Sequence, residues 1–176
     1  IAEKKIDPLM IPISRAIAKT HYFFTSSTCS GRITLMDLNT NEAKKPGAFF
    51  RKWHRVVILR EVWDGIQDHT NTGNLWFKQD AFVFLIGTNT MENAQHILRI
   101  CHENGVKRAG INHAEPGKVH VEIFGTQNMS VPVKEGKKIL VEKEYVKRLV
   151  SIANRKWKQN DALLKTFCKA LAKELE

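Results

Sequence analysis

The chain has 176 residues, of which 43% are hydrophobic and 26% are charged, and its 28 Lys and Arg outnumber 18 Asp and Glu. This length and composition predict a single folded domain over residues 1–176 with a substantial hydrophobic core, and exclude a chain that is disordered throughout. The longest apolar run covers residues 81–87, far short of the roughly 20 residues of a membrane-spanning helix.

The net charge of +10 is the first indication of function. An excess of cations attracts polyanions and drives nucleic-acid binding by counterion release. The alternative is that the charge only keeps the protein in solution. The charge by itself therefore leaves both interpretations open.

The three cysteines Cys29, Cys101 and Cys168 lie far apart and form no Cys-x-x-Cys motif. This spacing argues against a disulfide scaffold and against a cysteine-based zinc site. The first residues also lack the pattern of a secretory signal. We therefore expect a cytoplasmic protein in a reducing compartment.

Hydrophobic periodicity and turn residues predict the order of the elements. In chain order we expect a helix at 12–19, strands at 22–24 and 32–36, a loop at 39–47, an apolar strand-forming segment at 48–59, a short helix at 62–69, a strand at 75–88, a helix from Thr90 to about Asn104, strands at 106–112, 118–124, 129–133 and 139–142, and a helical tail at 146–175 with a polar break at 159–161. Strands and helices mix without strict alternation. This pattern predicts an α+β fold, with a mixed β-sheet, flanking helices and a long C-terminal helix.

A dense cluster of small polar residues, Thr25–Arg32, lies between two predicted strands. Its hydroxyls, backbone N–H groups and one guanidinium suit an anion or a polar ligand head. The alternative is an ordinary Ser/Thr/Gly hairpin with an exposed Arg. Cys29 and Arg32 are too close in sequence for a phosphatase-type loop, so Cys29 matches no known nucleophile pattern.

Familiar metal and nucleotide motifs are missing from the sequence. Seven histidines occur, but none forms His-x-x-x-His or His-Glu-x-x-His, so we expect no protein-bound metal. There is also no Gly-x-Gly-x-x-Gly loop after a strand and no Gly-Lys-Ser/Thr loop. A Rossmann-type nucleotide site is therefore not expected.

The positive charge is concentrated near the C-terminus, where residues 134–176 hold 12 Lys and Arg against 6 Asp and Glu. Lys165, Lys169 and Lys173 recur every four residues, and Lys156 and Lys158 flank Trp157. Such a pattern is typical of the solvated face of an amphipathic helix. The functional alternative is a surface that follows RNA phosphates, with nearby aromatic rings able to stack on bases.

The polar cluster, read as Thr-x-Ser-Thr-Cys-Ser-Gly-Arg, resembles the Ser-x-Ser-Ser-Cys-x-Gly-Arg signature of the tRNA wybutosine-synthesising protein 3 family. Thr28 replaces the usual Ser, and Leu85 stands where a His is expected. The similarity covers nearly the whole chain, and its further matches are Asp7, Pro12-Ile13, Trp53-His54, residues 106–111, residues 131–133, Tyr145 and Asn154.

The resemblance implies an S-adenosylmethionine-dependent N-methyltransferase of a non-Rossmann type. Its substrate would be the tricyclic wyosine-type guanine beside the anticodon of phenylalanine tRNA, methylated on N4. Asp7 or His54 is our hypothesis for the proton acceptor, and Lys156, Lys158, Lys165, Lys169 and Lys173 are the expected tRNA contacts. The residues expected to bind substrate or cofactor are Ser27, Thr28, Cys29, Gly31, Arg32, Arg108 and Gly110.

Two other functional classes stay open at this point. A non-catalytic basic RNA-binding module would use the charged tail without needing the polar cluster. A different group-transfer enzyme would use the polar cluster to hold a phosphate and would be indifferent to tRNA.

Overall fold

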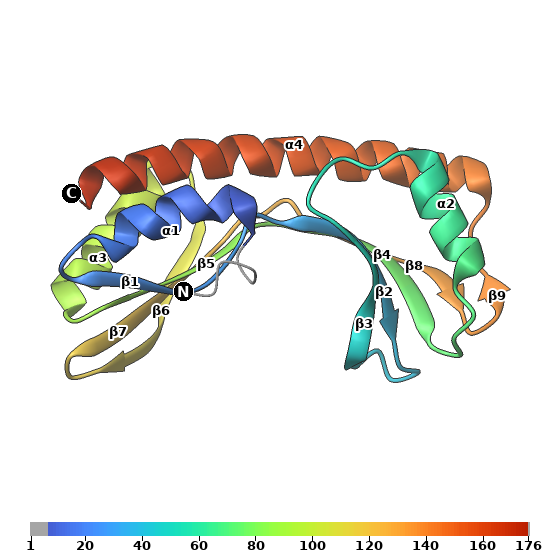
Figure 1. Ribbon diagram of the computed structural model, residues 1–176, viewed down its shortest axis with the longest axis horizontal. Helices are drawn as coiled ribbons and strands as arrows, with labels where there is room; N and C mark the ends of the chain where they lie inside the picture. The colour runs from blue at the N-terminus through green and yellow to red at the C-terminus, as the bar shows by residue number, and fades with distance from the viewer. Residues whose placement is uncertain (1–6, 176) are drawn as a thin grey trace. The chain divides into compact units, whose positions relative to one another are not determined.

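The computed structural model describes residues 7–175, except for the side chains of Lys44 and Lys45. The chain divides into two compact units (Figure 1). Unit 1 comprises residues 1–30, 81–126 and 160–176, and unit 2 comprises residues 31–80 and 127–159. The chain therefore passes between the units four times, and neither unit is one continuous stretch of sequence. The expectation of a single domain stays a prediction.

Unit 1 is built on a four-stranded sheet in the order β1-β5-β7-β6, and all its pairings are antiparallel. Helices cover one face of this sheet, because the buried side chains of Phe84, Val121 and Ile123 pack with those of Ile13 and Phe167. The bounds are η2 Pro8–Met10, α1 Ile11–Ala18, β1 Phe23–Cys29, β5 Val83–Thr88, α3 Met91–Glu103, β6 Arg108–Glu115 and β7 Lys118–Phe124.

Local sequence explains two of these elements. Strand β7 alternates between buried and accessible residues, as a strand with one covered face requires. Helix α3 begins where Thr90 caps it, with the Thr90 hydroxyl accepting a hydrogen bond from the Asn93 N–H at 3.1 Å. The predictions for both elements are confirmed.

Unit 2 is built on a five-stranded antiparallel sheet in the order β3-β2-β4-β8-β9. The central strand β2 is buried along nearly its whole length, and Ile33 and Leu35 pack with Val62 of α2 and Leu149 of α4. The bounds are β2 Arg32–Leu38, β3 Lys44–Trp53, α2 Leu59–Asp68, β4 Asn74–Asp80, β8 Met129–Glu135, β9 Lys138–Ile139 and α4 Lys143–Glu174.

The long helix α4 is continuous, as expected, and the polar residues 159–161 interrupt its apolar stripe without ending the helix. Asn160 is 1% exposed and occupies a position of the buried stripe that includes Ala153, Leu164 and Phe167. Its spacing of seven residues from Ala153 and four from Leu164 keeps it on that face. The helix continues because this polar residue faces inward and has partners there.

Those partners are backbone groups of unit 1. The Asn160 amide oxygen accepts a hydrogen bond from the Phe82 N–H at 2.8 Å, and its amide nitrogen donates to the Ser30 carbonyl at 2.7 Å. A Cβ placed on Gly125 would lie 2.9 Å from the Asn160 oxygen and 2.8 Å from the Ala81 Cβ. Glycine is therefore required at position 125 by close packing against Asn160.

The α+β class and the long C-terminal helix are confirmed, but the sheets differ from the single mixed sheet that we expected. The segment 75–88 forms two strands, β4 and β5, which belong to different sheets. The polar cluster also forms no hairpin, because β1 extends to Cys29 and pairs with β5, whereas β2 pairs with β3 and β4. Only Ser30 and Gly31 separate these strands, and Gly31 has φ +100°, a region that glycine adopts without strain.

Three other predicted boundaries are wrong. Strand β3 begins at Lys44, inside the predicted loop at 39–47, and ends at Trp53 rather than 59. Of the predicted strand at 139–142, only residue 139 lies in a strand, the two-residue β9.

In the part of the chain that the structure describes, no helix is long and apolar enough to cross a membrane.

Replacing Asn160 by Ala should lower the free energy of unfolding by about 2–4 kcal/mol, because a buried N–H and a buried carbonyl lose their partner. Urea denaturation measures this difference. Gln159→Ala, at an exposed position one residue earlier, is the matched control and should change stability by less than about 0.5 kcal/mol. Equal effects of the two substitutions would show that the Asn160 contacts contribute nothing.

Two cysteines should react only when the protein unfolds. Burial raises the pKa of the Cys101 and Cys168 thiols to about 12, so both stay protonated and unreactive in the folded protein at pH 8. Unfolding restores the ordinary value of 9.0, so stability should fall as the pH rises above about 9. Ellman's reagent with and without denaturant checks this prediction, and fast labelling of either thiol in the folded protein would contradict it.

Candidate active site

The face of the unit 1 sheet that the helices leave uncovered carries four of the expected site residues. Residues directly opposite one another in an antiparallel sheet point to the same side. The register aligns Ser27 with Leu85, Glu122 and Gly110 in one row. Since Leu85 and Glu122 alternate with the buried core residues of their strands, this row lies on the uncovered face.

The next row on the same face contains Cys29, Val83, Phe124 and Arg108. Ser27, Cys29, Arg108 and Gly110, which lie far apart in sequence, therefore share one open surface of unit 1. Thr28 aligns instead with the buried residue Phe84, so its side chain belongs to the opposite, helix-covered face. The structure thus separates Thr28 from its neighbours in the signature.

Arg108 and Gly110 border a shallow groove of about 350 Å³ on this face. The groove is also lined by Asn112 of β6 and by Glu122 and Phe124 of β7. The Arg108 guanidinium lies 5.7 Å from the centre of the Phe124 ring. An open groove with a cation, a carboxylate and an aromatic ring suits a polar organic ligand.

Asp7 ties the first turn of the chain to the end of β1. One carboxylate oxygen accepts a hydrogen bond from the Leu9 N–H at 3.1 Å and so caps the short helix η2. The other accepts from the Ser30 N–H at 3.0 Å and from the Ser30 hydroxyl. These three donors give Asp7 a structural role next to the signature.

Arg32 is the first residue of β2 in unit 2, and its side chain is only 27% exposed. Its Nε lies 3.5 Å from the Asp80 carboxylate, and its guanidinium lies 4.4 Å from the centre of the Phe49 ring. The ring therefore covers one face of the guanidinium, and Asp80 neutralises part of its charge. Arg32 is thus held in place, unlike the freely exposed Arg of an ordinary hairpin.

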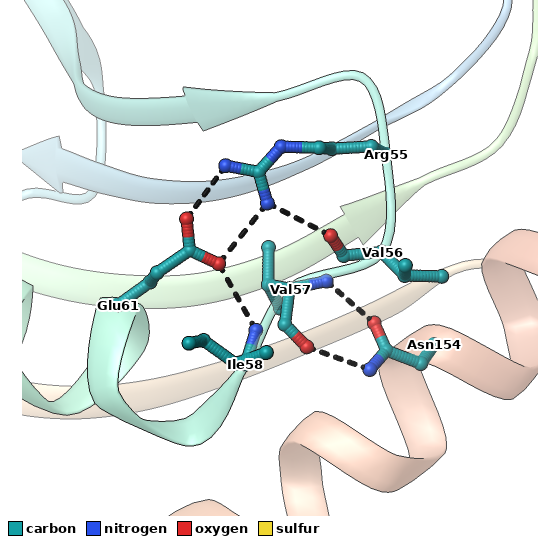
Figure 2. A network of polar contacts seen from close by, with 6 residues as sticks. All are labelled: Arg55, Val56, Val57, Ile58, Glu61 and Asn154. Atoms are coloured by element: carbon teal, nitrogen blue, oxygen red, sulfur yellow. Dashed lines mark hydrogen bonds and ion pairs between the residues drawn. The ribbon is translucent and has the colours of Figure 1, made fainter.

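His54 follows the last residue of β3 and begins a loop, residues 54–58, that leads into α2. Figure 2 shows how polar contacts hold this loop. The Asn154 side chain of α4 accepts from the Val57 N–H at 2.9 Å and donates to the Val57 carbonyl at 2.8 Å. Asn154, one of the residues that match the family pattern, therefore holds the loop that begins at His54.

An ion pair on the same loop adds to this order (Figure 2). Two Arg55 nitrogens donate to the Glu61 carboxylate at 2.6 and 3.0 Å, and Glu61 also accepts from the Ile58 N–H at 3.0 Å. The hydrogen bond from Arg55 lowers the pKa of Glu61, and the same contact raises the pKa of Arg55. Both groups therefore stay charged at neutral pH, and their hydrogen bonds hold the loop against the first turn of α2.

The expected RNA-binding lysines fall in both units. Lys156 and Lys158 belong to the unit 2 part of α4, and Lys165, Lys169 and Lys173 are exposed in the unit 1 part. Lys165 forms an ion pair with Asp161 at 2.7 Å. The last 17 residues hold three Lys against three acidic residues, so they carry no net charge.

The excess positive charge lies in unit 2. This unit contains 17 Lys and Arg against nine Asp and Glu, a net charge of +8, whereas unit 1 carries the remaining +2. The acidic residues of the C-terminal segment offset its lysines. The electrostatic attraction for a polyanion is therefore centred on unit 2.

Comparison with known proteins identifies the family. Residues 1–173 match the family model described as Methyltransferase TYW3. The chain belongs to this family. The family and the enzyme class expected from the polar signature are thereby confirmed, and the chain is a member of a tRNA-modifying methyltransferase family.

Individual relatives agree. A Thermococcus kodakarensis protein named tRNA(Phe) 7-((3-amino-3-carboxypropyl)-4-demethylwyosine(37)-N(4))-methyltransferase 1 is 33% identical over 154 residues, 88% of this chain and 77% of the relative. A Pyrococcus furiosus protein of the same name is 35% identical over 150 residues, 85% of this chain and 76% of the relative. The solved structure of PH1069 from Pyrococcus horikoshii matches this chain with a TM-score of 0.85 at 32% sequence identity. The match covers 95% of this chain and 84% of the PH1069 chain.

The sequence also contained signals that our predictions did not use. The alternation within residues 118–124 places Glu122 and Phe124 on one face, away from Val121 and Ile123. Spacing along α4 places Asn160 on its apolar stripe. No local pattern predicts that Ser27 and Gly110 share a row, because strand order and register decide that.

Proposed function

We propose that this chain transfers a methyl group from S-adenosylmethionine to N4 of 7-(3-amino-3-carboxypropyl)-4-demethylwyosine at position 37 of tRNA(Phe). The main support is membership of the Methyltransferase TYW3 family, together with relatives whose names state this substrate and reaction. The shared open face of Ser27, Cys29, Arg108 and Gly110 supports a ligand site in unit 1. The cytoplasm as the place of this reaction stays a prediction.

The groove beside Gly110 fits a methyl donor of this kind, since it offers a cation, a carboxylate and an aromatic ring to a polar ligand. S-adenosylmethionine, when bound, supplies an electrophilic methyl group on a positively charged sulfur. The methyl–sulfur bond breaks as the bond to N4 forms, and N4 loses one proton. The protein residues must align the acceptor nitrogen and remove that proton, and alignment alone accounts for much of the acceleration in such reactions.

We assign substrate or cofactor binding to Ser27, Cys29, Gly31, Arg32, Arg108 and Gly110. Arg108 reaches the groove, and Arg32 is held by Phe49 and Asp80. Thr28 remains part of the expected set, but its row faces the core, which favours a packing role. Each of these roles is a proposal.

His54 is the better supported of the two proton acceptors. The Asp7 carboxylate already accepts three hydrogen bonds that hold the start of the chain against β1. His54 lies at the start of a loop fixed by Asn154 and Glu61. An imidazole carried by an ordered loop is a suitable general base.

The decisive experiment uses labelled S-adenosylmethionine and tRNA from a strain that lacks this activity, followed by nucleoside analysis. We expect one label per tRNA, on the wyosine-type base at position 37. His54→Ala should lower the single-turnover rate by about 10²–10⁴-fold, the usual contribution of a general base. Asp7→Asn should mainly lower thermal stability.

Three results would contradict these assignments. Label elsewhere, or none at all with intact wild-type protein, would refute the proposed reaction. A protein that binds tRNA but shows no saturable heat with S-adenosylmethionine would instead be an RNA-binding module. Retention of the full rate by both Asp7→Asn and His54→Ala would exclude both residues as the proton acceptor.

The charge distribution predicts which lysines bind tRNA. Replacing Arg155, Lys156 and Lys158 together by Gln should weaken tRNA binding and reduce its salt dependence by about 0.7–0.9 per lost phosphate contact. The matched triple replacement of Lys165, Lys169 and Lys173 should have the smaller effect, because that segment is neutral overall and Lys165 is paired. Filter binding over a range of salt concentrations checks both variants. A larger effect of the second set would contradict this assignment.

A further inference from the structure

The groove on the open face of β6 and β7 carries two opposite charges that indicate which chemical group it binds. Arg108 and Asn112 of β6 line it together with Glu122 and Phe124 of β7. All four side chains come from two paired strands, Arg108 directly opposite Phe124 and Gly110 directly opposite Glu122. The strand pairing therefore fixes the spacing of the opposite charges.

Among the residues that the structure describes, neither charge is neutralised by an opposite charge. In the described part of the chain, no carboxylate lies within ion-pairing distance of the Arg108 guanidinium, whose recorded neighbour is the Phe124 ring at 5.7 Å. The Glu122 carboxylate accepts a hydrogen bond from the Asn112 amide at 3.4 Å and has no described cation within ion-pairing distance. The described part of the chain thus leaves one cation and one anion without an ion-pair partner at the same groove.

Gly110 keeps the floor of this groove open. A Cβ at position 110 would meet nothing within 4 Å, and the backbone there does not have a positive φ. Neither packing nor backbone conformation therefore requires glycine, although glycine weakens a strand. Glycine within a strand often marks a place where a ligand comes close to the backbone.

We propose that this groove binds a zwitterionic α-amino-acid group, with Arg108 holding its carboxylate and Glu122 its ammonium. A guanidinium pairs with a carboxylate through two parallel hydrogen bonds, and a carboxylate beside a neutral amide suits an ammonium. The apolar methylene chain of the ligand lies over Gly110 and beside the Phe124 ring.

Two molecules of the proposed reaction carry this group, so the assignment of its source rests on the proposed function. S-adenosylmethionine has a 3-amino-3-carboxypropyl chain on its sulfur, and the base named for the relatives has the same chain at position 7. Glu122 shares its row with Ser27, two strands away. Two strand spacings are about 10 Å, so a ligand anchored at Glu122 extends toward the signature residues.

The test compares Arg108→Gln, Glu122→Gln and Gly110→Val, the last of which fills the groove without a clash inside the protein. The matched controls are Arg99→Gln, Glu103→Gln and Ala114→Val, which are exposed in unit 1 and outside the groove. Thermal melting should show that the groove variants stay folded. Arg108→Gln and Glu122→Gln should each lower the affinity for the amino-acid group by about 10–100-fold, the range for a lost charged hydrogen bond. Gly110→Val should also lower this affinity, because its side chain fills the space of the ligand's methylene chain.

Two binding comparisons show whether the amino-acid group in the groove belongs to the methyl donor or to the substrate base. If the groove holds the donor, the groove variants bind S-adenosylhomocysteine more weakly, while binding of 5′-methylthioadenosine, which lacks the amino-acid group, is unchanged. If the groove holds the substrate chain, S-adenosylhomocysteine binding is unchanged. The groove variants then no longer bind tRNA with the 3-amino-3-carboxypropyl group more tightly than tRNA whose wyosine base lacks this group. Variants that behave like their controls in both comparisons would overturn the proposal.

A third measurement tests ligand binding in the groove independently of methyl transfer. In amide NMR spectra of the wild-type protein, L-methionine should shift the Gly110 and Asn112 signals, and 3-(methylthio)propylamine, which lacks the carboxylate, should shift them less. These shifts would support the groove even if the chain methylated no tRNA. Absence of methionine shifts at about 50 mM, together with unchanged binding in both comparisons, would refute the groove while leaving the methyltransferase proposal intact.

Discussion

The buried side chain of Asn160 is the interaction on which unit 1 depends. Its amide joins the Ser30 carbonyl, at the end of β1, to the Phe82 N–H, just before β5, and it packs against Gly125, just after β7. Three strands that carry the open face are thus held at one end by one residue of α4. A buried amide with both groups satisfied specifies one arrangement, because any shift leaves a polar group without a partner.

The register that Asn160 helps to maintain assembles the candidate site from distant parts of the sequence. Ser27 and Cys29 come from the signature, and Arg108, Gly110, Glu122 and Phe124 come from the β6–β7 hairpin. An antiparallel sheet with one face covered by helices leaves its other face available for ligands. In the proposed site, paired strands rather than a glycine-rich nucleotide loop space the binding groups.

Local patterns in the sequence were enough to predict the α+β class, helix α3, strand β7 and the family. The Thr90 cap, the alternation of residues 118–124 and the signature are all short-range features. These local patterns do not predict which strands pair over long distances in the sequence. Residues 75–88 form one apolar stretch in the sequence but two strands in two different sheets. The polar residues of β1 form a strand because they pair with β5. The role of Asn160 was missed because a polar residue on an apolar stripe was interpreted as an interruption.

The discontinuous units also constrain how the protein folds during its synthesis. The core of unit 1 contains Phe84 and Ile123 from the middle of the chain and Phe167 and Leu171 from its end. The strands of unit 1 therefore leave the ribosome long before the helix segment that covers them. Until then the part of their apolar face that α4 covers is exposed to association with other chains, so the nascent chain is prone to aggregate in the interval between translation of β7 and of the last turns of α4.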